Sequence, residues 1–195
     1  MGPNMPGVNV GVIVGSHRRD SINRKLARAL VRLADGKLTA NFVQIDDLPM
    51  YNQDLESPLP ASVARLKAAI EETAALLIVT PEHNRSIPAV LKNAIDWGSR
   101  PYGCNSWVGK TVAIIGTSPG AFGTAIAQQH LRYVLGDLGA LVMGGEAYVT
   151  FKPDLIAETG TVTDAGTLRF LQSFIDQLAR LAAHLTTPKA SPAAA

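Results

Sequence analysis

The sequence predicts a three-layer α/β fold in which a five-stranded parallel sheet is covered by helices on both faces. Five short apolar segments alternate along the 195-residue chain with five segments whose apolar residues recur at helical spacing. The chain contains no internal repeat. Because consecutive parallel strands need a crossover connection, usually a helix, this alternation is typical of a parallel sheet between two helical layers.

The strand segments share an apolar composition. The first, VNVGVIVG, ends in glycine, and the third, ALLIV, is apolar throughout, as expected for a strand that is buried on both faces. We predict strands over residues 8–15, 38–45, 75–79, 111–116 and 140–149.

The helices are predicted from apolar residues three or four positions apart. The first helix follows the first strand after a polar loop, and the second begins after Pro60. The positions that mark the helices are Ile22, Leu26, Leu30 and Leu33; Val63, Leu66 and Ile70; Val90, Leu91, Ala94 and Ile95; the segment 125–135; and Leu168, Leu171, Ile175, Leu178 and Leu185.

All of these segments fall within residues 8–186, which we expect to form one domain, because a chain of this length suits a single core. The ends, 1–7 and 187–195, are rich in Pro, Gly, Ser and Ala, so we expect both to be mobile.

Charge and cysteine content argue against several classes of protein. The formal net charge is +2, from 18 basic and 16 acidic residues without a basic cluster, so no nucleic acid partner is expected. Cys104 is the single cysteine, which excludes an internal disulfide. We find neither a charged-then-apolar leader nor an apolar run that could span a bilayer, and we expect a cytoplasmic protein without membrane contact. The histidines show no metal-ligand spacing, so no metal is expected.

The loop after the first strand, GSHRRDSIN, carries candidate anion-binding residues. A dinucleotide-binding turn requires the pattern G-x-G-x-x-G, whereas this loop offers Gly15 alone. Its donor residues are Ser16, Arg18, Ser21 and Asn23. They surround a predicted helix start, where unpaired backbone N–H groups and the positive end of the helix dipole favour a terminal monophosphate. In the alternative interpretation, Ser21 only caps the helix and the arginines are solvated.

Two further loops are expected at the same edge of the sheet, where ligands bind in folds of this kind. The third strand is followed by TPEHNRSIP, whose main-chain donors suit a flat heterocycle. The fourth strand leads into SPGAFG, in which Ser118 and Gly120 allow the close approach of a ring. Ordinary strand-to-helix turns are the alternative interpretation of both loops.

Four pieces of the chain resemble, in the same order, the NADPH-dependent FMN reductases with a flavodoxin-like fold, a family that includes chromate and quinone reductases and related azoreductases. The pieces are GSHRRDSINRKLA, LPMYNQDLE, PEHNRSIPAVLKNAIDW and GTSPGAFG, in a resemblance that spans roughly residues 8–149. The third piece is the specific one. The resemblance implies a flavodoxin-like three-layer sandwich.

By this resemblance, the first loop binds the phosphate of FMN and the other two border its isoalloxazine ring. The implied phosphate ligands are Ser16, Arg18, Ser21 and Asn23, and the implied ring contacts are Pro81, Glu82, His83, Asn84, Ser118 and Gly120. The chain departs from the family at His83, where tyrosine is usual, so the wall of the ring site there is smaller and titratable. In the alternative interpretation, His83 is an inert, solvent-facing replacement.

The resemblance implies an oxidoreductase that passes electrons from NADPH or NADH through bound FMN to quinones, azo compounds, free flavin or metal oxyanions such as chromate. No catalytic side chain is expected, because the flavin carries the chemistry. A non-enzymatic, flavodoxin-type electron carrier is one alternative, although flavodoxins are strongly acidic and this chain is not. A flavin-free interaction protein is another.

The piece LPMYNQDLE carries the apolar residues Met50, Tyr51 and Leu55 outside any predicted core stripe. The resemblance places this loop near the flavin of a neighbouring subunit, so we expect a homodimer or homotetramer with Asp54 and Leu55 at the interface. A loop folded onto its own domain is the alternative. The other expected partners are small-molecule electron acceptors.

Overall fold

A computed structural model describes residues 7–186, and its central feature is a parallel sheet. The strands lie in the order β2-β1-β3-β4-β5, and β6 also pairs with β4. Their bounds are β1 (Val8–Val14), β2 (Leu38–Val43), β3 (Ala75–Val79), β4 (Thr111–Ser118), β5 (Leu141–Val142) and β6 (Tyr148–Thr150). The predicted α/β fold with a parallel sheet is confirmed.

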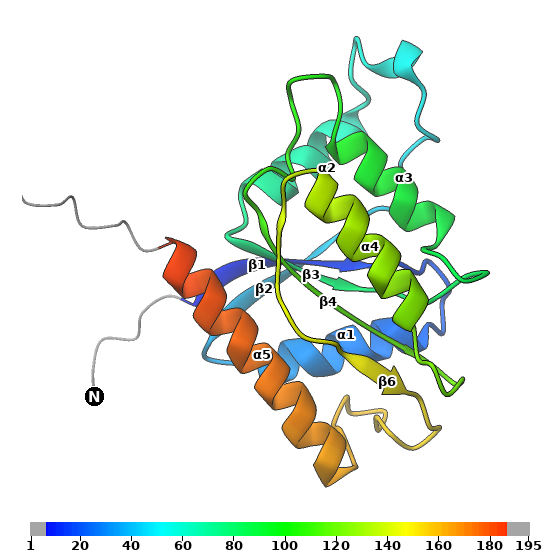
Figure 1. Cartoon of the computed structure of the whole chain (residues 1–195), viewed down its shortest axis with the longest axis vertical. Helices are drawn as coiled ribbons and strands as arrows, with labels where there is room; N and C mark the ends of the chain where they lie inside the picture. The colour runs from blue at the N-terminus through cyan, green and yellow to red at the C-terminus, as the bar shows by residue number, and fades with distance from the viewer. Residues whose placement is uncertain (1–6, 187–195) are drawn as a thin grey trace, which may run out of the picture.

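The helices cover the two faces of the sheet unequally (Figure 1). In the described part of the chain they are α1 (Ile22–Leu33), the short 3-10 helix η1 (Gln53–Leu55), α2 (Ala61–Glu71), α3 (Ala89–Gly98), α4 (Ala125–Asp137) and α5 (Ala165–Thr186). One face packs against α1 and α5, and the other packs against α2, α3 and α4. All five predicted helices are present.

Two buried clusters hold these layers together because successive side chains of a strand point to opposite faces. In β1, Val12 belongs to the cluster that contains Leu30 of α1. The next residue, Ile13, belongs to the cluster that contains Leu66 of α2 and Ile95 of α3. All five side chains are fully buried, so the sheet has an apolar core on each face.

The predicted fifth strand, residues 140–149, is divided into β5 and β6. Its two halves still pair with β4, β5 at the start of β4 and β6 at its end. Between them, the guanidinium of Arg132 binds the carbonyl oxygens of Met143 and Gly145, and Gly145 adopts a φ of +89°. Where the backbone leaves the ladder, two of its carbonyls therefore bond to a helix side chain in place of a neighbouring strand.

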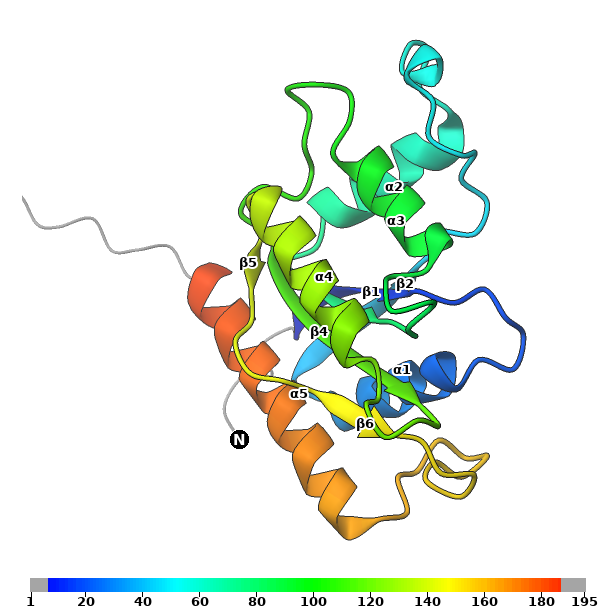
Figure 2. The same ribbon diagram turned by 45° about the vertical axis from the view of Figure 1, so that its right-hand side comes forward.

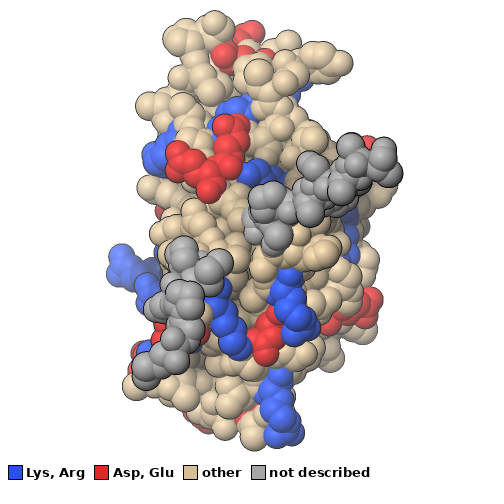
Figure 3. Space-filling model, turned by 90° about the vertical axis from the view of Figure 1, so that its left-hand side faces the viewer, with Lys and Arg blue, Asp and Glu red and all other residues tan. Residues whose placement is uncertain are grey.

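The surface carries charges of both signs. On the face seen in Figure 3, basic and acidic side chains are interspersed. No helix within residues 7–186 has the length and apolarity that a membrane crossing needs. The terminal segments that the sequence predicts to be mobile, 1–7 and 187–195, lie outside the described residues apart from Gly7.

Candidate functional site

A pocket of about 450 Å³ opens where β1, β3 and β4 end. The loops that follow these three strands lie on the same side of the molecule (Figure 2). The predicted site residues that line the pocket are Ser16, Arg18, Ser21, Asn23, Pro81, Glu82, His83 and Ser118. Asn84 instead lines an adjoining cavity beside α3 and α4, and Gly120 lies just beyond Ser118, whose Oγ accepts its N–H at 3.3 Å.

One end of the pocket is the N-terminus of α1. Ser21 is the N-cap residue, and its Oγ accepts the backbone N–H of Arg24 at 3.3 Å. The cap uses this hydroxyl as an acceptor, so its hydrogen can still be donated to an anion. The first turn of α1 contains no acidic residue, so no carboxylate there offsets the positive end of the helix dipole. Arg18 lines the pocket here and is exposed.

Asn23 fixes this helix start to the sheet. Its side chain is buried, and its amide makes two hydrogen bonds of 2.9 Å with the backbone of Thr117 in β4. In one bond the Asn23 Nδ2 donates to the carbonyl oxygen, and in the other the Thr117 N–H donates to Oδ1. The amide that the sequence assigned to phosphate binding therefore joins the first loop to the third.

Gly15 allows β1 to end close to β3. A Cβ atom at this position would lie 2.7 Å from Oγ1 of Thr80, which follows β3 directly. Such a distance is too short for any side chain, so the glycine serves the packing of the two strand ends. Strand packing therefore accounts for Gly15 without a dinucleotide-binding turn, which requires three glycines.

The turn after β3 is a tight hairpin. The backbones of His83 and Ser86 exchange two hydrogen bonds of 2.9 Å. Between them, Asn84 and Arg85 have φ values of 49° and 63°, as in a type I′ turn. His83 is exposed and lines both the pocket and the adjoining cavity, which places its ring at the rim.

Glu82 lines the pocket, but its carboxylate bonds elsewhere. Oε2 accepts the backbone N–H groups of Ile126 and Ala127 at the start of α4, and Oε1 forms an ion pair with Arg85 at 3.2 Å. The family resemblance implies Glu82 as a contact of the flavin ring, and nothing in the sequence indicates these bonding partners.

The loops after β3 and β4 and the start of α3 also contribute apolar lining to the pocket. These residues are Pro81, Pro88, Ala89, Val90 and Pro119. Ser118 keeps the loop after β4 compact, because its hydroxyl donates to the carbonyl oxygen of Gly123 at 2.6 Å. A flat ring system suits these walls, with polar contacts from backbone groups.

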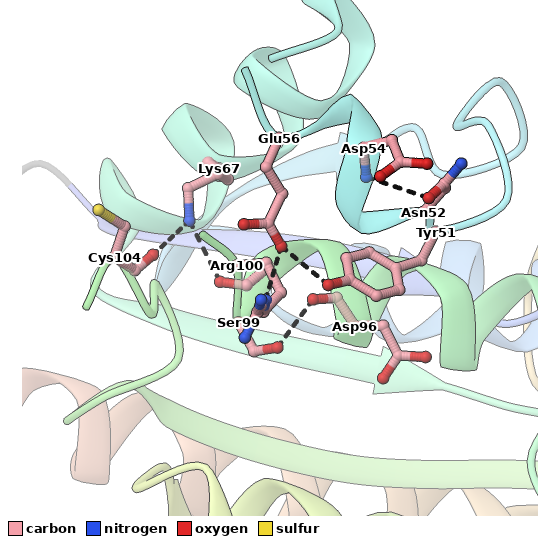
Figure 4. A network of polar contacts seen from close by, with 10 residues as sticks. Tyr51, Asn52, Asp54, Glu56, Lys67, Asp96, Ser99, Arg100 and Cys104 are labelled. Atoms are coloured by element: carbon pink, nitrogen blue, oxygen red, sulfur yellow. Dashed lines mark hydrogen bonds and ion pairs between the residues drawn. The ribbon is translucent and has the colours of Figure 1, made fainter. Parts of the chain in front are cut away.

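The loop that precedes α2 projects beside α3 and contains a polar network (Figure 4). The Glu56 carboxylate accepts bonds from the Tyr51 hydroxyl at 2.8 Å and from Arg100 Nε at 2.7 Å. The Arg100 guanidinium holds the pKa of Glu56 below its usual value, and the carboxylate raises the pKa of Tyr51. The Tyr51 ring also packs edge-on against Trp97. Met50 remains 74% exposed, so this loop is only partly folded onto its own domain.

Cys104 is exposed, in the loop that follows α3. The buried Nζ of Lys67 donates to the carbonyls of Gly98 and Cys104 and to the hydroxyl of Ser106. Burial lowers the pKa of this lysine. These bonds fix the loop without involving the thiol.

Comparison with known proteins identifies the family. The profile of the NADPH-dependent FMN reductases matches residues 8–154. The chain belongs to this family. A 2-hydroxy-1,4-benzoquinone reductase from a Burkholderia species is 47% identical over 173 residues, which cover 88% of this chain and 94% of that protein.

Solved structures support the same family. FerB from Paracoccus denitrificans, a flavoenzyme NAD(P)H:(acceptor) oxidoreductase, is 48% identical with a TM-score of 0.88, and the match covers 91% of this chain and 98% of FerB. A WrbA-like flavodoxin from Agrobacterium tumefaciens has a TM-score of 0.59 at 17% identity over 92% of this chain and 100% of that one. The fold of this FMN reductase family member is therefore flavodoxin-like.

As an FMN reductase family member, the protein is an oxidoreductase that uses FMN with NADPH or NADH. The residues that line the pocket fit this cofactor. Hydroxyls, an arginine and a helix N-terminus suit the phosphate, and the apolar walls suit the isoalloxazine ring.

Proposed function

We propose that the protein transfers electrons from NADPH or NADH to quinones, through FMN held in the pocket where β1, β3 and β4 end. The observation that carries this proposal is that hydroxyls, an arginine and the N-terminus of α1 line the same pocket as the apolar residues of the loops after β3 and β4. The quinone acceptor is supported by the name of the Burkholderia relative. Azo compounds, free flavin and metal oxyanions such as chromate are further acceptors that we include in the proposal.

Each part of the pocket has a separate task. Ser16, Arg18 and Ser21 bind the phosphate together with the backbone N–H groups at the start of α1, where the charge of Arg18 strengthens its contact. The redox chemistry would be supplied by bound FMN, which can take up a hydride from a nicotinamide and release electrons to an acceptor. The backbone of residues 81–84 and the loop from Ser118 orient the ring and leave one side accessible to both substrates.

We propose in addition that the protein is a homodimer or homotetramer in which the loop at residues 48–56 contacts a neighbouring subunit. Its exposed apolar residues, Met50 and Leu55, support this proposal, because a projecting loop with such side chains favours a protein contact. Asp54 and Leu55 are the proposed interface residues. Sedimentation should detect an oligomer at micromolar concentration, and a fully active monomer would contradict a shared site.

Anaerobic mixing tests the electron transfer. Protein loaded with FMN should lose its visible flavin absorbance on addition of NADPH or NADH alone, and subsequent addition of a quinone should restore it. A panel of acceptors then ranks quinones against azo dyes, free FMN and chromate. If neither nucleotide bleaches the flavin in folded, FMN-loaded protein, the proposed electron transfer is wrong and a carrier that needs a separate reductase is favoured.

A further inference from the structure

The N-terminus of α4 is capped by a carboxylate from a different loop. Thr124 occupies the N-cap position, but its hydroxyl accepts a bond from Gln128 and makes no capping bond. Oε2 of Glu82 accepts the N–H groups of Ile126 and Ala127 instead, at 3.0 and 3.2 Å. The Glu82 side chain is 9% exposed, so little water competes for these bonds. Its negative charge also interacts favourably with this end of the helix.

Two further contacts join the turn after β3 to the segment around the start of α4. The guanidinium carbon of Arg85 lies 5.8 Å from the ring centroid of Phe122. Oγ of Ser86 and Nδ1 of His130 lie 3.1 Å apart, at hydrogen-bond distance. The turn therefore contacts this segment at three points, of which the Glu82 carboxylate is the most buried.

The turn needs such support because its backbone is unfavourable. Arg85 has a φ of 63°, in the left-handed region that non-glycine residues rarely occupy. The ion pair with Glu82 on one side and the Phe122 ring on the other hold this residue in place. Loss of the carboxylate would remove both the helix cap and the ion pair.

We propose that Glu82 is a positioning residue of the flavin site, an inference that rests on the proposed function. Pro81 and His83 line the pocket from the turn after β3, and Ser118 and Pro119 line it from the loop after β4. The Glu82 carboxylate joins this turn to α4, the helix that follows the second loop, and so sets the distance between the two lining segments. Its side chain acts on FMN through the backbone that it holds, because its oxygens are bonded to α4 and to Arg85.

The test uses the full-length apoprotein and three variants. Glu82→Ala removes the cap, and Glu82→Gln keeps an oxygen that accepts the same N–H groups. Glu158→Ala is the control, because Glu158 does not line the pocket and its side chain is 93% exposed. FMN affinity is measured by quenching of flavin fluorescence. Backbone hydrogen exchange is measured over residues 82–86 and 119–127 in the absence of FMN.

We expect Glu82→Ala to weaken FMN binding by about tenfold, which corresponds to about 1.4 kcal/mol, and to accelerate exchange in both segments. Glu82→Gln should stay within about threefold of the parent affinity, because its amide oxygen still caps the helix and the lost ion pair, in which Arg85 is 65% exposed, contributes little. Glu158→Ala should change neither quantity. The rescue by glutamine separates a positioning role from a general loss of stability.

Two results would overturn the proposal. In the first, Glu82→Ala accelerates exchange only at the start of α4 and leaves the turn and FMN affinity unchanged. In the second, Glu82→Gln weakens FMN binding and accelerates exchange as much as Glu82→Ala does. If the alanine variant does not fold, a loss of FMN affinity of more than about threefold in Glu82→Gln overturns the proposal by itself. Failure of the parent to bind FMN would refute the proposed function, whereas the exchange rates would still show whether Glu82 holds both segments.

Discussion

Replacement of Asn23 by alanine is expected to destabilise the protein strongly, although the residue lies in a loop-to-helix junction. Asn23 is 1% exposed, and its amide pairs with both the N–H and the carbonyl of Thr117 at 2.9 Å. The substitution leaves a buried donor and a buried acceptor without partners, at a cost of about 1–3 kcal/mol each. Because water from the adjacent pocket can replace part of this loss, we expect the free energy of unfolding to fall by about 2–4 kcal/mol.

Urea denaturation of the apoprotein measures this quantity. Asn41→Ala is the matched control, because Asn41 is an exposed asparagine of β2 whose amide bonds only to Asn9 among the contacts described, and its loss should cost about 0.5 kcal/mol or less. Asn23→Asp should also be destabilised, because a carboxylate cannot donate to the Thr117 carbonyl. Equal losses for Asn23→Ala and Asn41→Ala would refute the reasoning.

Three further predictions concern the site and the pH dependence of stability. Arg18→Ala should weaken FMN by about 1.5–3 kcal/mol, or one to two decades in affinity, because a charge-assisted contact is lost; fluorescence titration with unchanged affinity would contradict the phosphate assignment. His83→Tyr should change the acceptor profile, because the imidazole that lines the pocket rim is replaced by a larger phenol ring; identical steady-state profiles would exclude a role for this side chain. Asp164 directly precedes α5, and its Oδ1 accepts the backbone N–H of Thr167 at 2.7 Å, which holds the pKa of Asp164 below its ordinary value of 3.8. The stability that this hydrogen bond provides is therefore present above pH 3.8 and lost as the pH falls below it. Asp164→Asn should therefore reduce the acid-induced loss of unfolding free energy, and an unchanged dependence on pH would contradict this.

The sequence predicts the layers of this fold well, because the spacing of apolar residues within a short segment is enough to distinguish a strand from a helix. Apolar residues such as those of ALLIV fall in β3, and the stripe from Ile22 to Leu33 is α1. The interruption of the fifth strand could not be predicted, because it depends on Arg132, a residue of α4 that binds carbonyls at Met143 and Gly145 only after the helix has packed.

In the candidate site, the sequence likewise predicts which loops meet but not which partners single side chains bond to. The strand-end rule placed the three loops correctly, since eight predicted residues line one pocket. The bonding partners of two of them were not predictable, because Asn23 and Thr117 are 94 positions apart and Glu82 and Ile126 are 44 apart. Thr124 is a common N-cap residue, so the sequence gives no sign that α4 takes its cap from another loop.

In the proposed function, one pocket serves both the nicotinamide donor and the acceptor. Steady-state rates with NADPH and a quinone varied together test this shared use of the pocket most directly. If donor and acceptor occupy the same position in turn, double-reciprocal plots at several quinone concentrations give parallel lines, as in a ping-pong scheme. Intersecting lines would mean that donor and acceptor are bound together, and would contradict this shared use.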